Sequence, residues 1–229
     1  MSTKQLTITI GDSAAKDSRV AAVIRISETE LCCDSNELRQ LQTVLKQSAT
    51  GKAIALQELY TWDIEMLIDY IINFHHQYVK DNAVVIYDLA QKVMYRHSEK
   101  HPEFKKLTSQ IFLFLHGLLN HLMKEEKLLF PEMKQLIRDK RLTGTVIYTT
   151  LDLIKNGVRL MQKQHLVAEE DMNVFRELTN DYKVPEDTCT LCNLLFKKMS
   201  EFENDLIMHI YLENKILFPK LIAMDEALK

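Results

Sequence analysis

Histidine and glutamate recur at metal-ligand spacing in two nearly identical blocks of this sequence. The segment His-Leu-Met-Lys-Glu-Glu-Lys-Leu-Leu-Phe-Pro at 121–131 returns 88 residues later as His-Ile-Tyr-Leu-Glu-Asn-Lys-Ile-Leu-Phe-Pro at 209–219. Residues four apart share one face of a helix, so each block presents an imidazole and a carboxylate on the same side. Both groups bind metal ions, and the repeat therefore predicts a metal site.

Each block is preceded by a further histidine at nearly the same distance. His76 lies 45 residues before His121, and His165 lies 44 residues before His209. If the chain reverses near the midpoint of each interval, the two histidines of a pair stand at equal height on neighbouring helices. The expected ligand set is His76, His121, Glu125, His165, His209 and Glu213.

Six nitrogen and oxygen ligands suit two metal ions better than one. Structural zinc usually takes four ligands and favours thiolates, which these motifs lack. Mixed imidazole and carboxylate ligation fits iron, with the two carboxylates bridging the pair. The Glu-x-x-His motif of ferritin-like sites is absent around these histidines, which disfavours that class. Two unpaired glutamates inside a helical core would each cost several kcal/mol, so they require a compensating cation.

Long amphipathic helices must carry these ligands. Isoleucine recurs at positions 64, 68 and 72, and similar four-residue spacing of apolar side chains continues to the end of the chain. This periodicity predicts helices over 62–97, 104–139, 146–180 and 187–223, with a kink in the first at Asp81-Asn82. Short breaks at His101-Pro102, Thr143-Gly144 and 183–185 predict an all-α, antiparallel four-helix bundle over residues 59–229.

A separate small unit is expected over residues 1–58. Its apolar patches are short, Gly51 marks one break, and Asp34 followed by Glu37 resembles a capping box that opens a helix at 35–47. Two or three short helices are predicted here.

Composition excludes several other classes of protein. The chain has 229 residues with 5 Gly and 4 Pro, roughly a third of the usual share, which argues against an all-β fold rich in turns. A net charge of −3 argues against a nucleic-acid binder. The sequence has neither an apolar run of membrane-spanning length nor a signal-peptide core, and four cysteines are too few for a disulfide scaffold. A cytoplasmic protein is expected.

The repeated block resembles the hemerythrin-like signature, and the whole arrangement is similar to the Repair of Iron Centers family. The resemblance spans nearly the whole chain, because that family also places a small helical domain with paired cysteines ahead of a hemerythrin-like bundle. It implies a centre of two iron ions with oxo and carboxylate bridges, held by the same six residues. It also implies a role in repairing iron–sulfur clusters damaged by nitrosative or oxidative stress.

The resemblance bears on residues that spacing alone does not assign. Both His75 and His76 fit the apolar stripe of their helix, and the family pattern selects His76. His97 also matches a histidine common in the family. However, 21 residues of helix separate it from His76, about 31 Å, so it is left out of the ligand set unless the chain folds back at Asp81-Asn82.

The cysteines are interpreted separately. Cys32 and Cys33 match the paired cysteines of the family and are candidates for redox or iron-transfer chemistry, although Asp34-Ser35 stands where the family has Gly-Gly. Cys189 and Cys192 lack a second pair or a following histidine, which favours structural thiols.

Other polar positions are expected outside the ligand set. His101 and His116 are interpreted as surface residues, and Gln164 replaces a glutamate that the family often carries before the third histidine.

Three functions are compatible with the sequence. The first is donation of iron to iron–sulfur proteins with damaged clusters, which would be the partners. The second is binding or sensing of O₂ or NO by a hemerythrin-like module, and the third is NO or peroxide reduction by a di-iron enzyme. The N-terminal cysteines favour repair. Whether the protein turns over a substrate, which cluster protein it serves and whether it forms a homodimer stay open.

Overall fold

The computed structural model describes residues 56–145 and 148–226. Cys32, Cys33 and the helix expected at 35–47 lie outside this part of the chain. Contacts divide the chain into a unit Met1–Asp63 and a unit Ile64–Lys229, so the division falls five residues after the boundary expected from sequence. The described part of the first unit is residues 56–63, which contain helix α2 (Leu56–Thr61).

The second unit consists of four long helical segments, which we call legs one to four in chain order. Three of them are interrupted by a π-helical segment, whereas leg three is one uninterrupted α-helix. Leg one comprises α3 (Ile64–Tyr70), η1 (Ile71–His76) and α4 (Gln77–His97); leg two comprises α5 (Glu103–Lys124), η2 (Glu125–Leu129) and α6 (Phe130–Thr143); leg three is α7 (Tyr148–Thr179); leg four comprises α8 (Thr190–Tyr211), η3 (Leu212–Leu217) and α9 (Phe218–Glu226).

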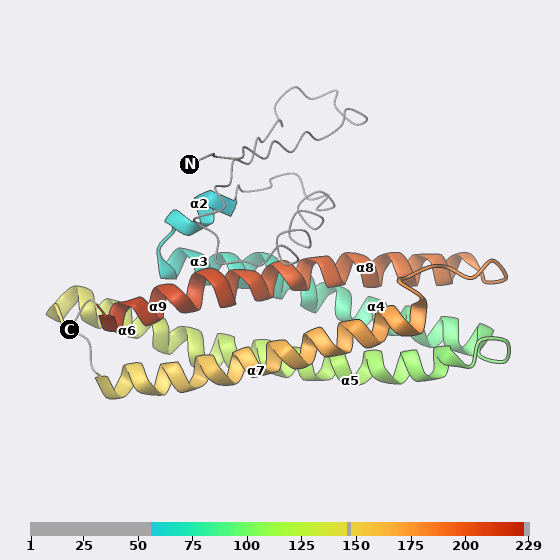
Figure 1. Cartoon of the computed structure of the whole chain (residues 1–229), viewed down its shortest axis with the longest axis horizontal. Helices are drawn as coiled ribbons and strands as arrows, with labels where there is room; N and C mark the ends of the chain where they lie inside the picture. Colours follow the sequence, from blue (N-terminus) through green and yellow to red (C-terminus); the bar gives the residue numbers. More distant parts are fainter. Residues whose placement is uncertain (1–55, 146–147, 227–229) are drawn as a thin grey trace, which may run out of the picture. The chain divides into compact units, whose positions relative to one another are not determined.

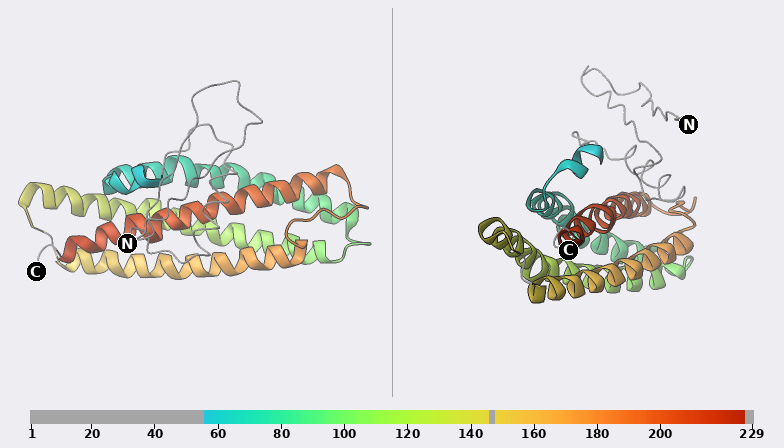
Figure 2. Two further views of the ribbon diagram at one scale, coloured as in Figure 1. Left: turned by 45° about the horizontal axis from the view of Figure 1, so that its top comes forward. Right: turned by 60° about the vertical axis from the view of Figure 1, so that its left-hand side comes forward.

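The four legs form an antiparallel bundle. Helix α4 packs against α5 and α8, and α7 packs against α5 and α8, so that each leg has two neighbours (Figures 1 and 2). The turn at 98–102 and the connection at 180–189 lie at the same end of the bundle, which we call the turn end. The predicted all-α bundle is confirmed for the described part of the chain.

Local sequence explains where the legs end. Gly144 follows α6 with φ of 71°, a left-handed conformation that favours glycine, and its N–H donates to the Lys140 carbonyl at 2.9 Å. Pro102 precedes the first residue of α5, where a missing N–H costs nothing. The left-handed turn after α7 comprises Asn180, Asp181 and Tyr182, all with positive φ.

The kink expected at Asp81-Asn82 is absent, because α4 runs without a break from Gln77 to His97. Side chains that favour turns elsewhere bond along the helix here. The Nδ2 group of Asn82 donates to the Tyr78 carbonyl at 2.9 Å, and the Nε2 group of Gln77 donates to Oδ1 of Asp81 at 2.7 Å. These bonds span four residues, so both side chains are satisfied within an unbroken helix.

Prolines explain two of the three π-helical segments. Pro131 lies two residues after the last residue of η2, and Pro219 lies two residues after the last residue of η3. A proline inside a helix has no N–H to donate, and its ring crowds the carbonyl four residues earlier. A wider π turn just upstream relieves both conflicts. Segment η1 contains no proline and neither does the chain immediately after it.

Apolar side chains fill the bundle between the middle of the legs and the turn end. The buried cluster consists of Val79, Ala83, Ile86, Leu89, Ala90, Val93, Phe104, Leu107, Ile111, Phe114, Leu115, Leu118, Leu122, Met172, Phe175, Cys192, Leu195, Phe196, Met199, Phe202, Leu206 and Ile210. Burial of this surface is the main stabilising contribution to the bundle. None of the helices in residues 56–145 and 148–226 has the length and apolar character required to span a membrane.

Candidate metal centre

All six side chains expected to bind metal lie together at one level of the bundle. Legs one to four contribute one histidine each, and legs two and four also contribute one glutamate each. The residues are His76 at the end of η1, His121 in α5, Glu125 at the start of η2, His165 in α7, His209 in α8 and Glu213 in η3. They form two groups, in each of which four potential ligand atoms lie within 4.8 Å of one another.

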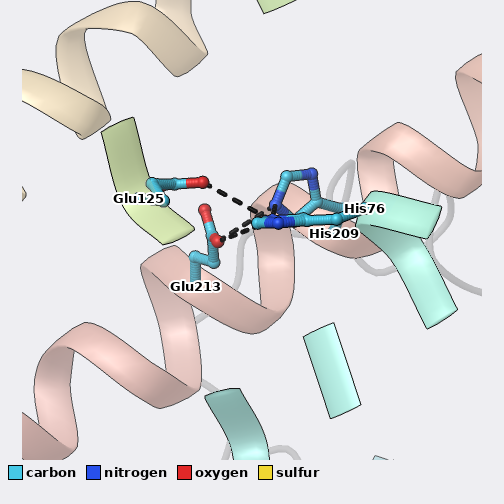
Figure 3. Close-up of side chains that lie close together, drawn as sticks. All are labelled: His76, Glu125, His209 and Glu213. Carbon is cyan, nitrogen blue, oxygen red and sulfur yellow. Dashed lines mark hydrogen bonds and ion pairs between the residues drawn. The ribbon is translucent and has the colours of Figure 1, made fainter. Parts of the chain in front are cut away.

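The first group joins legs one and four to both glutamates (Figure 3). Nε2 of His209 lies 3.0 Å from Oε1 of Glu213. Nε2 of His76 lies 3.5 Å from Oε2 of Glu125 and 3.8 Å from Oε1 of Glu213. All four side chains are completely buried.

The second group joins legs two and three to the same two glutamates. Nε2 of His121 lies 3.3 Å from Oε1 of Glu125, and Nε2 of His165 lies 3.0 Å from Oε2 of Glu213. Each carboxylate therefore turns one oxygen to the first group and its other oxygen to the second. Such a carboxylate is placed to be shared by two cations.

The histidines are held with Nε2 toward the centre. The Nδ1 groups of His76, His121 and His165 donate to Oε1 of Glu126 at 2.8 Å, Oε1 of Gln164 at 2.8 Å and Oδ1 of Asn214 at 3.0 Å. The bonds are assigned with the proton on Nδ1, because a carboxylate and amide oxygens can only accept. The second nitrogen, Nε2, then carries a lone pair, as a metal ligand requires.

Electron-rich atoms face one another at the centre. The Nε2 atoms of His76 and His209 are 3.2 Å apart, as are those of His121 and His165. All four oxygens of Glu125 and Glu213 are buried without a hydrogen-bond donor among the described residues. Buried carboxylates without donors are costly, and cations between these atoms would compensate them. The arrangement of these atoms therefore fits bound metal ions.

Burial shifts the pKa values of two side chains at the centre, Glu125 and His209. Burial, and next the nearby carboxylate of Glu213, raise the pKa of Glu125 well above its usual range. Burial also lowers the pKa of His209 to about 3, so its imidazole is neutral at pH 7 and available as a ligand.

Comparison with known proteins gives the same assignment. The family described as hemerythrin HHE cation binding domain matches residues 67–221, more than half of the chain. The chain belongs to the hemerythrin HHE family. Its bundle is a metal-binding domain, and the expectation drawn from the repeated histidine and glutamate blocks is confirmed at this level.

Relatives of this hemerythrin HHE protein support the narrower resemblance as well. A protein from Escherichia coli O81 (strain ED1a) named iron-sulfur cluster repair protein YtfE is 25% identical over 224 residues, which cover 93% of this chain and 96% of the relative. A protein from Haemophilus influenzae named probable iron-sulfur cluster repair protein is 31% identical over 156 residues, 68% of this chain and 64% of the relative. These matches confirm the resemblance to the Repair of Iron Centers family.

The other histidines of the hemerythrin HHE domain lie outside the centre. His75 is buried, but its Nδ1 lies 3.0 Å from Oδ1 of Asp205, so the geometry favours His76 as the ligand. His97 lies at the turn end, with Nε2 3.1 Å from Sγ of Cys189. His116 is exposed, as expected. His101 is partly buried instead, because it bridges Glu103 and Asp187 at 3.0 and 2.9 Å.

Sequence reasoning missed the acceptors that orient the ligands. Glu126 and Asn214 each directly follow a ligand glutamate in the two repeated blocks, and each binds the upstream histidine of its own hairpin. The signal that could have found them is in the repeat, because a polar residue follows the ligand glutamate in both blocks. Glu126 also accepts from Nζ of Lys80 at 2.6 and 2.8 Å, a contact that spacing does not reveal.

Proposed function

We propose that this protein holds two iron ions between the six side chains and donates iron to iron–sulfur proteins whose clusters have been damaged by nitrosative or oxidative stress. The observation that carries the proposal is the orientation of Glu125 and Glu213, each with one oxygen in each ligand group. Four imidazoles and two carboxylates give mixed nitrogen and oxygen ligation, which suits iron. When bound, such a pair supplies exchangeable, redox-active iron.

Relatives named for cluster repair support the direction of this transfer. The Escherichia coli relative aligns over 93% of the chain, so the similarity includes residues outside the bundle. We assign Cys32 and Cys33 to contact with the damaged protein or to reception of iron, in the cytoplasm, with NO or O₂ as small ligands of the centre. Those cysteines lie outside the described residues, and their assignment rests on the family resemblance.

The protein's own residues make the two metal positions unequal. In the first group the imidazole of His76 donates to a carboxylate, Glu126, which is itself paired with Lys80, while Nδ1 of His209 has no hydrogen-bond partner among the described residues. In the second group both imidazoles donate to neutral amides, those of Gln164 and Asn214. A carboxylate partner makes an imidazole a stronger ligand than an amide partner does. We therefore assign firmer retention to the first position and donation of iron to the second.

Metal content tests the proposed iron pair. Protein purified aerobically should contain about two irons per chain, because the six ligands form two groups. Glu125→Ala should lose most of that iron, since one shared ligand is removed from both groups. Isolation with zinc alone, or with one iron that survives Glu125→Ala unchanged, would contradict the assignment.

Repair is tested by incubating the iron-loaded protein with a hydro-lyase whose [4Fe–4S] cluster has lost one iron to peroxide. Activity should return in proportion to the iron supplied, and it should return faster than with the same amount of free ferrous iron in the presence of a chelator. The Glu125→Ala/Glu213→Ala variant, prepared in the same way, is the matched control. Equal recovery with protein and with chelated iron would exclude donation by this centre.

A further inference from the structure

Two cysteines lie at the N-terminus of α8, at the turn end of the bundle. Cys189 is the residue before the helix, with extended backbone at φ −88° and ψ 170°, and Cys192 is the third residue of the helix. The Cys192 N–H donates to the Cys189 carbonyl at 2.9 Å. Cys189 is partly exposed, whereas Cys192 is completely buried in the apolar cluster. This backbone bond closes a single turn, and the charge of Cys189 contributes to the raised pKa of Cys192, so the two thiols are close to each other.

A histidine from another leg meets the exposed thiol. Nε2 of His97, the last residue of α4, lies 3.1 Å from Sγ of Cys189. The backbone N–H of Cys189 donates to the same Nε2 at 3.3 Å, so this nitrogen carries the lone pair of the neutral ring. The imidazole is therefore placed to accept the thiol proton. His97 and Cys189 are 92 residues apart in sequence, so the pair exists only in the folded bundle.

The two thiols differ in their pKa values. In a redox-active pair, the thiol with the lower pKa attacks the substrate, and the other thiol then forms the disulfide with it. The hydrogen bond with His97 lowers the pKa of Cys189 from 9.0 to about 6, helped by the amides of Leu191 and Cys192 and by Arg96. Burial raises the pKa of Cys192. At the same end of the bundle, His101 bridges Glu103 and Asp187, and Lys100 lies 4.0 Å from Asp187.

We propose that Cys189 and Cys192 form a redox-active dithiol, with His97 as the base, that reduces hydrogen peroxide. The Cys189 thiolate attacks one peroxide oxygen, an S–O bond forms, the O–O bond breaks, and the leaving hydroxide takes the proton held by His97 to become water. The thiol of Cys192 then attacks the Cys189 sulfenic acid, an S–S bond forms, the S–O bond breaks, and a second water leaves with the Cys192 proton. Two electrons pass from the dithiol to one peroxide.

This site is independent of the metal centre and of the function proposed for it. Helix α4 runs for 21 residues without a break between the level of His76 and His97, about 31 Å at 1.5 Å per residue. None of the three residues contacts a metal ligand in the structure. Peroxide reduction is therefore separate from iron binding. We expect that loss of the bound iron leaves the dithiol active and that loss of the dithiol leaves the iron bound.

Alkylation of the iron-loaded full-length protein tests the activated thiol. A thiol with pKa about 6 is half ionised at pH 6, where one with pKa 9 is about 0.1% ionised; after allowance for the weaker nucleophilicity of the more acidic thiol, about 20-fold faster alkylation is expected. The rate at Cys189 should rise with pH to half its plateau near pH 6. His97→Gln keeps a polar side chain without a base, and it should slow alkylation at pH 6 by roughly 10-fold. His97→Asn serves as a second variant.

Trypsin separates the two cysteine pairs, so no cysteine needs to be removed. Cys189 and Cys192 fall in the peptide Val184–Lys197, and Cys32 and Cys33 fall in Ile26–Arg39. After a stoichiometric dose of hydrogen peroxide, Val184–Lys197 should lose two hydrogens in mass and resist alkylation until it is reduced. Cys192→Ser should instead leave a sulfenic acid on Cys189 that dimedone traps, and Cys192→Ala should do the same.

Comparison of the original protein with the His97→Gln variant tests the proposed role of the dithiol. Slower oxidation of Val184–Lys197 in His97→Gln at unchanged iron content supports it, because oxidation driven by iron would affect both proteins equally. Equal rates in the two proteins, a Cys189 alkylation midpoint above pH 8, or absence of the disulfide after peroxide would each overturn it. Zinc that protects this peptide and is released by a chelator would also overturn it, since it would make the pair a metal site.

Discussion

The Nδ1 group of His76 donates to Oε1 of Glu126 over 2.8 Å, and this acceptor is the residue that follows the ligand Glu125. Leg two thus supplies both a carboxylate for the metal groups and the carboxylate that fixes the imidazole of leg one. Asn214 repeats the relation in the second hairpin with a neutral oxygen, 3.0 Å from Nδ1 of His165. The two hairpins share this contact and differ in the charge of its acceptor.

Removing that charge should weaken one metal position. Glu126→Gln keeps an acceptor of the same size for His76 but removes the carboxylate and its pairing with Lys80. We expect roughly 10-fold weaker iron retention, the lower end of the range for such supporting groups. Competition with a ferrous chelator measures it. Glu132→Gln, an exposed change on the same leg, is the matched control, and equal retention in both variants would show that the charge is unimportant.

The two shared glutamates should be equivalent. Glu125→Gln and Glu213→Gln keep the volume of the side chain and remove a negative charge that both ligand groups use. An amide is a poor ligand between two cations, so each variant should lose most of its iron, to a similar extent. Iron content and the near-UV absorption of the iron centre, measured after identical loading, provide the comparison. Loss confined to one variant would mean that only one carboxylate is shared.

Much of the bundle could be predicted from the sequence, because proline and glycine mark the ends of several of its helices. The legs end close to the expected positions at Pro102 and Gly144. Proline has no N–H to donate, and glycine readily adopts the positive φ that ends a helix. The kink at Asp81-Asn82 was a wrong prediction, because these polar side chains bond to their own helix when tertiary packing holds it straight. The conformational preference of the two residues alone does not predict the effect of tertiary packing.

The six candidate ligands follow from the repeat, whereas the features around them depend on contacts between legs. The π turns of η2 and η3 could have been expected from Pro131 and Pro219, but η1 has no such signal. The pairing of His97 with Cys189 joins residues 92 apart and depends on the height at which two legs end. Periodicity assigns a residue to a face of its own helix and leaves the partner on another helix undetermined.

The second unit should fold and bind iron by itself. Every proposed ligand lies beyond Ile64, where the contacts divide the chain. A protein beginning at Ile64 should keep its helical circular dichroism and the same iron content per chain as the full-length protein. Metal analysis of the two proteins, loaded side by side, measures this. Failure of a helical, folded fragment to hold iron would mean that the first unit supplies a ligand.

A charge pair in the core should contribute to stability. The Glu203 carboxylate is buried in the apolar cluster and pairs with the Arg176 guanidinium, which is about one-third exposed. Arg176→Met leaves this carboxylate without the guanidinium, and we expect a loss of about 3 kcal/mol in the free energy of unfolding, the lower end of the range for a buried pair, because Arg176 is partly exposed. Urea titration measures it. Arg176→Met/Glu203→Met, which removes both charges, should recover most of the loss; an equally unstable double variant would attribute the effect to packing.

His97 and His121 should respond differently to removal, because helix geometry separates their roles. Nε2 of His121 lies 3.3 Å from a ligand oxygen of Glu125, whereas His97 is at the far end of an unbroken α4 and contacts Cys189. His121→Ala should therefore lose a large part of the bound iron, while His97→Ala should keep its full complement. The same His97→Ala protein should show slower alkylation of Cys189, which proves that the variant is affected where the contact lies. If His97→Ala loses as much iron as His121→Ala, leg one must fold back on itself in solution and bring a fifth histidine to the metal centre.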